Sequence, residues 1–147
     1  MPRRRRPASA RASTRESARQ RLEAAAEGLL YASEADEPFA FVAFPAAERS
    51  DAPLTPQAFA RLAGAPEARV EAMDLDTFLA RHLDRSDPAD AEARRQRPRW
   101  RRLATALRET LDDVRVYRVG EVEVGCYVVG WTADGVLAGL RTVAVET

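Results

Sequence analysis

The chain passes from a predicted helix to a predicted strand through residues 28–39, GLLYASEADEPF. Three carboxylates fall within four positions here, at Glu34, Asp36 and Glu37, with no Lys or Arg within six residues on either side. The proline that follows them favours an extended backbone before it and prevents a helix from continuing. Ser33 can bond a backbone N–H two or three residues further on and hold Glu34 outward. The stretch is therefore predicted to be a stiff, exposed, acidic loop, able to bind a metal ion, a cationic groove or nothing.

The segments on either side of this loop have different apolar periodicities. Upstream, apolar residues recur three and four positions apart, which predicts an amphipathic helix over residues 14–30. Its apolar face comprises Leu22, Ala25, Ala26, Leu29 and Leu30. Downstream, residues 39–44, FAFVAF, are apolar at every position. This pattern predicts a central strand that is buried on both faces.

Two short helices are predicted from their capping residues. Thr55 is a good N-cap, and Pro56 suits the first helical position. Gly64 is expected to end this helix. A short strand at residues 69–73 then leads to Asp74, which can cap a second helix.

A charged segment separates these helices from the next one. Residues 84–97 are almost devoid of large apolar side chains, which predicts a mobile loop, with a helical turn over residues 88–95 as the alternative. Pro98 is then predicted to open a helix, because Pro is favoured at the first helical position. Its apolar face comprises Trp100, Leu103, Ala104, Leu107 and Leu111.

The last third of the chain has the signature of antiparallel strands. Strands are predicted at residues 114–119, 122–131 and 136–145, with turns at Gly120 and Gly135. The middle strand carries Val122, Val124, Cys126 and Val128 on one face and Tyr127, Val129 and Trp131 on the other. Because the strands are apolar on both faces, we expect helices to cover both sides of the sheet. The predicted fold is an α+β sandwich with a mainly antiparallel sheet.

The charges describe a basic arm attached to an acidic body. Residues 1–21 hold eight Arg and one acid, whereas the rest of the chain holds 15 Arg and 22 acids. We predict a disordered arm over residues 1–13 and a single domain over residues 14–147. The arm could tether nucleic acid or an anionic surface. It has no aromatic residue for base stacking, which favours a solvated tail.

The rest of the composition indicates in which cellular compartment the protein is expected. No apolar run approaches the roughly 18 residues that a membrane span needs. The N-terminus is basic but lacks the apolar stretch of a signal peptide. The single cysteine excludes an internal disulfide and fits a reducing compartment. We therefore expect a cytoplasmic protein without membrane association.

Catalytic motifs are scarce. The chain has one histidine, His82, expected as an exposed helix-end residue, and one cysteine, Cys126, expected as a small buried hydrophobe. It has no Gly-rich phosphate loop, zinc-ligand spacing or dinucleotide fingerprint. Glu34 and Asp36 could do acid–base work in a hydrolase, which we rank third among the functional hypotheses. We expect that the protein is not an enzyme.

The C-terminus is the second unusual feature. Residues 140–147, LRTVAVET, are strand-like up to the last position. A terminus tied into a sheet holds its α-carboxylate at a fixed place. Thr147 would then offer a rigid anion and a hydroxyl, and Glu146 a further carboxylate. Alternatively, the chain ends simply where the sheet ends.

Three segments together resemble the nuclease A inhibitor family. They are residues 27–39, EGLLYASEADEPF, residues 116–124, VYRVGEVEV, and residues 130–147, GWTADGVLAGLRTVAVET. The resemblance covers about residues 15–147 and leaves out the basic arm. It implies an α/β/α sandwich similar to the pathogenesis-related-1 proteins. It also implies an inhibitor of a sugar-non-specific DNA/RNA endonuclease of the ββα-metal type.

The resemblance assigns roles by position. It implies that Glu34 approaches the catalytic Mg²⁺ of the nuclease and that Thr147 also reaches the active site. Ser33, Asp36, Glu37 and Glu146 complete the expected partner-binding set. The inhibitor would have no cofactor of its own, because the Mg²⁺ or similar divalent cation belongs to the nuclease and bridges the two proteins.

The chain departs from the family pattern in its charged central loop. That loop can carry an aromatic residue that packs on the nuclease. Here no Phe, Tyr or Trp lies between Phe78 and Trp100, and Pro88 takes the corresponding place.

We expect a monomer before complex formation and no direct binding of nucleic acid. Action on nucleic acid through Arg3 to Arg6 is the second-ranked hypothesis.

Overall fold

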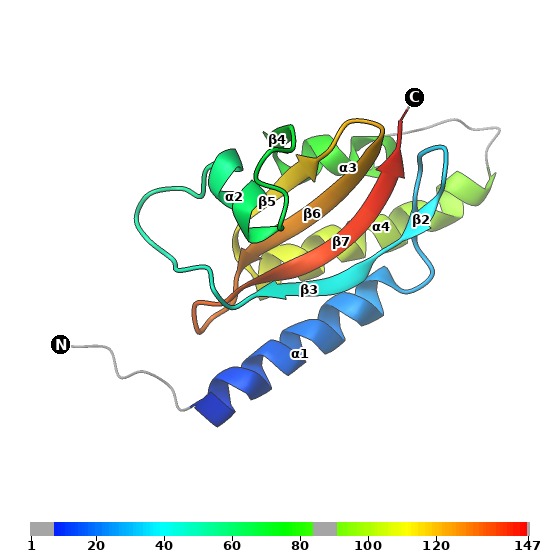
Figure 1. The fold of residues 1–147 in the computed structure, drawn as a ribbon. Coiled ribbons are helices and arrows are strands. Elements are labelled where there is room, and N and C mark those ends of the chain that lie inside the picture. Colours follow the sequence, from blue (N-terminus) through cyan, green and yellow to red (C-terminus); the bar gives the residue numbers. More distant parts are fainter. Residues whose placement is uncertain (1–7, 84–90, 147) are drawn as a thin grey trace.

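The computed structural model describes residues 8–83 and 91–146, which form a mixed α and β structure (Figure 1). The helices within these residues are α1 (Ala8–Ala26), α2 (Pro56–Leu62), α3 (Leu75–Leu83) and α4 (Ala91–Thr110). The strands are β1 (Leu30–Tyr31), β2 (Glu37–Pro38), β3 (Ala40–Phe44), β4 (Val70–Met73), β5 (Asp112–Val119), β6 (Glu123–Trp131) and β7 (Leu137–Val145). The predicted α+β class is thereby confirmed.

Five of the strands form one antiparallel sheet in the order β3-β7-β6-β5-β4. The consecutive strands β5, β6 and β7 are the predicted meander. Its two turns contain Gly120 and Gly135, whose φ angles are +115° and +86°. Glycine suits both turns because it adopts positive φ without steric cost.

The position of β3 corrects one prediction. Its residues were expected in a central strand, but β3 lies at the edge of the sheet and pairs only with β7 among the described strands. Both of its faces are nevertheless covered. Phe41 packs against the core on the side of α1, whereas Val42 and Phe44 pack against the core under α2. The apolar residues at every position of this strand therefore indicate that both of its faces are packed against other elements, and they do not indicate a central position in the sheet.

Two apolar clusters lie on the two sides of the sheet. The larger cluster includes residues of α1, α3 and α4 together with Val124, Cys126 and Val128 of β6. The smaller cluster joins Phe59 of α2 to Val129 and Trp131 on the other face of β6. The predicted alternation is confirmed from Val124 to Trp131, because successive side chains of a strand point to opposite faces. Val122 was predicted on the same face as Val124, but it precedes β6 and is 58% exposed.

The predicted helix caps are present. The Thr55 side chain accepts the N–H of Ala58 at 3.1 Å, and α2 begins at Pro56. The Asp74 carboxylate accepts the N–H of Thr77 at 2.7 Å at the start of α3. This hydrogen bond to the ionised form lowers the pKa of Asp74. Local capping chemistry therefore determines where both helices start.

The first helix has other boundaries than predicted. It begins at Ala8, within the segment predicted as disordered, and it ends at Ala26 and not at Leu30. Gly28 adopts a φ of +76°, which takes the chain out of the helix and frees Leu30 for β1. Residues 1–7 of the predicted arm lie outside the described residues.

The prediction that Pro98 opens a helix is wrong. Helix α4 already begins at Ala91 and contains Pro98 in its interior. Proline removes one helical hydrogen bond, that to the carbonyl of Arg94. Both residues are exposed, so water can solvate this carbonyl. The part of the predicted loop over residues 91–97 is helical, as the alternative proposed, and residues 84–90 lie outside the described part of the chain.

Candidate functional site

The acidic stretch forms the tip of a small hairpin. Strands β1 and β2 pair antiparallel, with Leu30 opposite Pro38 and Tyr31 opposite Glu37, and residues 32–36 make the turn. The Ser33 hydroxyl accepts the N–H of Ala35 at 3.2 Å, which is the local bond predicted for it. The Ser33 N–H in turn donates to the Asp36 carboxylate at 3.3 Å. The hairpin itself was missed, because its two strands are only two residues long.

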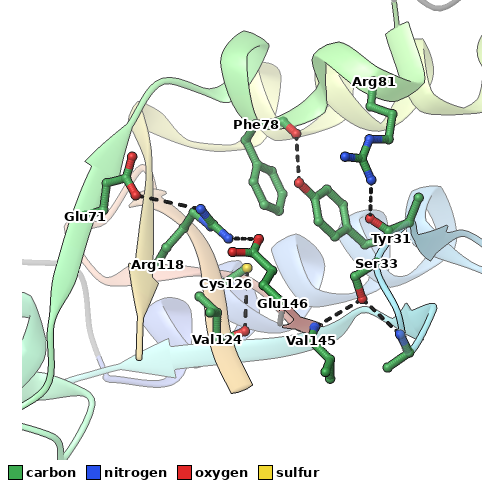
Figure 2. A network of polar contacts seen from close by, with 12 residues as sticks. Tyr31, Ser33, Glu71, Phe78, Arg81, Arg118, Val124, Cys126, Val145 and Glu146 are labelled. Atoms are coloured by element: carbon green, nitrogen blue, oxygen red, sulfur yellow. Dashed lines mark hydrogen bonds and ion pairs between the residues drawn. The ribbon is translucent and has the colours of Figure 1, made fainter. Parts of the chain in front are cut away.

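The C-terminal end of β7 lies against this hairpin tip (Figures 1 and 2). The N–H of Val145 donates to the Ser33 hydroxyl at 3.2 Å, and the N–H of Glu34 donates to the Val145 carbonyl at 3.3 Å. The Thr142 hydroxyl donates to the Glu37 carbonyl at 3.1 Å. Ser33 and Glu34 are thereby brought beside Glu146, which is more than 100 residues away in sequence.

The side chain of Glu146 is held by an arginine from β5. Arg118 pairs with Glu146 and also approaches Glu71 of β4 at 3.7 Å (Figure 2). The side chain of Arg118 is only 17% exposed, whereas that of Glu146 is 50% exposed. The N–H of Glu146 also donates to the carbonyl of Val122 at 2.8 Å. Glu146 was expected to face a partner, and here its carboxylate also anchors the end of the chain.

Helix α3 contacts the hairpin from the other side. Arg81 donates from Nη1 to the carbonyl of Ala32 at 3.0 Å, and the N–H of Ala32 donates to Nε2 of His82 at 3.2 Å. The hydroxyl of Tyr31 donates to the carbonyl of Phe78 at 3.2 Å, and the two rings stack with centroids 4.4 Å apart. The hairpin is therefore fixed to α3 by both backbone and ring contacts.

His82 corrects a second prediction. It was expected as an exposed helix-end residue, but it is half-buried and stacks on Trp100 with ring centroids 3.8 Å apart. Burial, followed by the nearby charge of Arg81, lowers the pKa of His82 from 6.5 to about 4, against an opposing effect of Asp36. His82 is thus neutral near pH 7 and belongs to the site. No local sequence signal pointed to it, because Ala32 and Trp100 lie in other segments.

The predicted site residues differ in exposure. Glu34 and Asp36 are exposed at the hairpin tip, Ser33 and Glu37 are half-buried, and Glu146 is exposed. Asp36 adopts a φ of +48°, a conformation that short polar side chains tolerate better than most. Thr147 lies outside the described residues. The structure therefore brings the predicted residues of the hairpin together with Glu146.

Two surface depressions flank the hairpin tip. One of about 400 Å³ lies between the hairpin and the end of β7 and is lined by Glu34, Arg81 and Glu146, among others. The other, of about 420 Å³, lies toward α4 and is lined by Asp36, Arg81 and His82 together with Leu30, which is 49% exposed. The tip is therefore an exposed acidic ridge between two hollows.

The structure offers little support for a nucleophilic enzyme. Cys126 is buried, as predicted, and its Sγ lies 3.6 Å from the carbonyl of Val124. Burial raises the pKa of the Cys126 thiol, which disfavours the reactive thiolate. Among residues 8–83 and 91–146, no three His, Cys, Asp or Glu side chains are grouped so that they could hold a metal ion.

None of the helices in that part of the chain is long and apolar enough to cross a membrane.

Comparison with known proteins agrees with the resemblance of the three segments. A search of curated proteins finds no match. A family model described as nuclease A inhibitor-like protein matches residues 16–147, which include the whole hairpin, the sheet and the C-terminal residue. The chain therefore belongs to the nuclease A inhibitor-like family.

Proposed function

We propose that the chain is a protein inhibitor that blocks the active site of a sugar-non-specific endonuclease of the ββα-metal type. One observation carries this proposal: the exposed Glu34 lies at the tip of a hairpin that bonds both to β7 and to α3. A carboxylate on such a support loses little conformational freedom when it docks, and this favours tight binding. Family membership supports the inhibitor class, which is a binding function and not catalysis.

The chemistry of the proposed partner suits a carboxylate. A metal-dependent nuclease binds phosphate oxygens through a divalent cation and cationic side chains. The Glu34 carboxylate would imitate one such oxygen and approach the Mg²⁺ or similar ion of the nuclease. The inhibitor would contribute a ligand to that ion and would have no cofactor of its own.

The C-terminal residue Thr147 is proposed as the second anchor. Val145 and Glu146, the last residues that the structure describes, lie beside Ser33 and Glu34, and this supports the proposal. The ion pair with Arg118 holds the side chain of Glu146, the residue before Thr147. In this proposal Asp36 and Glu37 shape the loop and its negative field.

The helices on both sides of the sheet support the α/β/α sandwich that the resemblance implies. The larger apolar cluster places α1, α3 and α4 on one side, and the smaller one places α2 on the other. Likeness to the pathogenesis-related-1 fold stays part of the proposal. The cytoplasm stays the expected compartment, on the argument from the single cysteine.

A cleavage assay tests the proposed function. A ββα-metal nuclease, ideally from the same organism, is mixed with the protein, and DNA cleavage is followed. We expect inhibition by the wild type and an affinity weakened roughly 30-fold by Glu34→Gln, since removing one partner of a desolvated charge pair costs about 2 kcal/mol or more.

The matched control is Glu48→Gln. Glu48 is exposed and follows β3, whose end lies beside the start of β7, away from the hairpin. This variant removes the same charge and should inhibit like the wild type. Full cleavage with a micromolar excess of wild type would refute inhibition of that nuclease, and equal potency of the two variants would refute the role of Glu34.

The nucleic-acid hypothesis, which assigns the contact to Arg3 to Arg6, ranks second. Two arginines further along the basic segment form ion pairs within the protein, Arg19 with Glu23 and Arg21 with Glu109. Deletion of residues 1–7 tests this hypothesis. Retention of DNA or RNA at low salt that depends on these residues would favour it over inhibition.

A further inference from the structure

Ala32 lies two residues before Glu34, and both of its backbone polar groups are bound by consecutive residues of α3. His82 accepts its N–H at 3.2 Å, and Arg81 donates to its carbonyl at 3.0 Å. Because one α3 side chain binds the N–H of Ala32 and the adjacent one binds its carbonyl, the two bonds together fix the orientation of Ala32. We refer to these two bonds as the α3 clamp.

The acceptor atom of the clamp is itself held in place. The imidazole of His82 stacks on Trp100 of α4, with the ring planes 16° apart. Its other neighbour is the ring of Tyr31, at 5.5 Å between centroids. Since Nε2 accepts a hydrogen bond, the neutral ring carries its proton on Nδ1. The imidazole of the clamp therefore packs beside two other aromatic rings.

The clamp complements the contacts with β7. On that side the hairpin tip is bonded only through Ser33 and Glu34 among the described contacts of the turn residues. On the side of α3, Tyr31 already contacts Phe78 through its hydroxyl and its ring, and the α3 clamp adds two bonds to Ala32 within the turn itself. Ordering a residue costs conformational entropy, and a loop that is ordered before docking does not incur this cost on forming the complex.

We propose that His82 and Arg81 are positioning residues, which orient the Glu34 hairpin through Ala32 and thereby set the lifetime of the inhibitory complex. The inference about the complex rests on the proposed function. The inference about the hairpin in the free protein does not, because it concerns the exchange of the Ala32 amide.

Two substitutions of His82 separate the clamp from simple packing. His82→Gln retains an acceptor at a similar reach but loses the aromatic stack. His82→Phe retains the stack on Trp100 but cannot accept the N–H of Ala32. If His82 positions the hairpin, His82→Gln should keep the wild-type properties of the hairpin and His82→Phe should lose them. If His82 only fills space beside Trp100, His82→Phe should keep them and His82→Gln should lose them.

Arg81, the other residue of the α3 clamp, is tested with a matched control. Arg81→Gln removes the guanidinium that donates to Ala32, and Arg61→Gln removes the same charge from the exposed end of α2, far from the hairpin. Comparison of the two separates loss of the bond from a change in net charge. Arg61→Gln is expected to behave like the wild type in every measurement.

The first measurement is hydrogen exchange of the Ala32 amide in the free protein, by NMR. We expect exchange of the Ala32 amide to be about tenfold faster in His82→Phe than in the wild type, because its hydrogen bond is lost, and near the wild-type rate in His82→Gln. Wild-type exchange in His82→Phe would overturn the clamp, whether or not the protein inhibits a nuclease.

The second measurement is the dissociation rate of the complex with an inhibited nuclease. We expect roughly tenfold faster dissociation for His82→Phe and Arg81→Gln, and little change for His82→Gln and Arg61→Gln. Wild-type dissociation of His82→Phe, together with fast amide exchange, would overturn the effect on the complex alone. Absence of any complex with the wild type would refute the proposed function and leave the amide result standing.

Discussion

The hydroxyl oxygen of Ser33 lies 3.2 Å from the backbone nitrogen of Val145, although 112 positions separate the two residues in the chain. The same oxygen accepts the N–H of Ala35, so a single hydroxyl closes the turn and joins it to the last strand. This relationship places the acidic hairpin at the C-terminal end of β7.

Ser33→Ala should destabilise the protein and weaken inhibition together. It removes the acceptor for two backbone N–H groups, and each lost hydrogen bond costs about 1 kcal/mol. Chemical denaturation should show a loss of about 1–2 kcal/mol in the free energy of unfolding. Ser50→Ala is the control, because the Ser50 hydroxyl contacts only the nearby Ala52 carbonyl among its described bonds. Equal stability of both variants would contradict the role of Ser33.

Residues appended after Thr147 should weaken inhibition without changing the melting temperature. An extension moves the α-carboxylate away from Thr147, which then keeps only its hydroxyl as a polar side-chain group. A Gly-Ser extension at the N-terminus serves as the control. If the affinity for the nuclease is the same for both extended proteins, the α-carboxylate of Thr147 is not an anchor.

The free energy of unfolding should fall as the pH drops from about 6.5 toward 4, in part because of His82. The folded state holds the pKa of His82 at about 4, whereas the unfolded chain binds a proton near the ordinary value of 6.5. Between these values only the unfolded state is protonated at this residue, so acid favours unfolding, and the contribution levels off below about pH 4.

Carboxylates titrate in part of the same range, so the comparison must isolate His82. Urea denaturation of the wild type and of His82→Gln from pH 7 to pH 4.5 does this, since both share the same carboxylates. The wild type should lose more stability over that range than the variant. Parallel profiles would show that His82 is protonated as easily in the folded protein as in the unfolded chain.

Arg118 and Glu146 should show a coupling free energy in a double-mutant cycle. Arg118→Met removes contacts with both Glu146 and Glu71, so it should destabilise more than Glu146→Gln. Because Glu146 is half exposed, we expect a coupling of about 1 kcal/mol and not the larger value of a fully buried pair. Strictly additive single effects in urea denaturation would show that the pair contributes nothing.

A chelator should weaken the complex if a metal ion bridges the two proteins. Affinity measured with and without EDTA should differ for the wild type, since the contact of Glu34 with the ion is lost. The difference should be much smaller for Glu34→Gln, which has already lost the charged ligand. An affinity of the wild type that does not respond to the chelator would refute the metal bridge.

Several elements were predictable because their physical cause is local. Thr55 and Asp74 cap α2 and α3 through bonds to residues three positions ahead. The alternation of Val124, Cys126 and Val128 identified one face of β6 because strand side chains alternate regardless of neighbours. The bond from Ala35 to Ser33 likewise spans two residues. The exposed, acidic character of the loop could likewise be predicted from residues that are neighbours in the sequence.

Other features depend on which distant segments meet. Residues 40–44 are apolar in an edge strand because α1 and α2 cover its two faces, and apolar content alone does not reveal strand order. His82 is half-buried and neutral because Trp100 and the hairpin pack on it, although its neighbours in sequence are those of an ordinary helix end.

The family, the helix caps, the meander and the acidic stretch with Glu34 could be predicted from the sequence, since each follows from residues close together in the chain or from a resemblance of segments. The bonds of Ser33 to Val145, of Arg118 to Glu146 and of Arg81 and His82 to Ala32 became visible only in the folded chain. The physical reason is that hydrogen bonds and ion pairs form between whichever groups the folded chain brings within about 3 Å. Periodicity and capping signals do not record which distant groups these are.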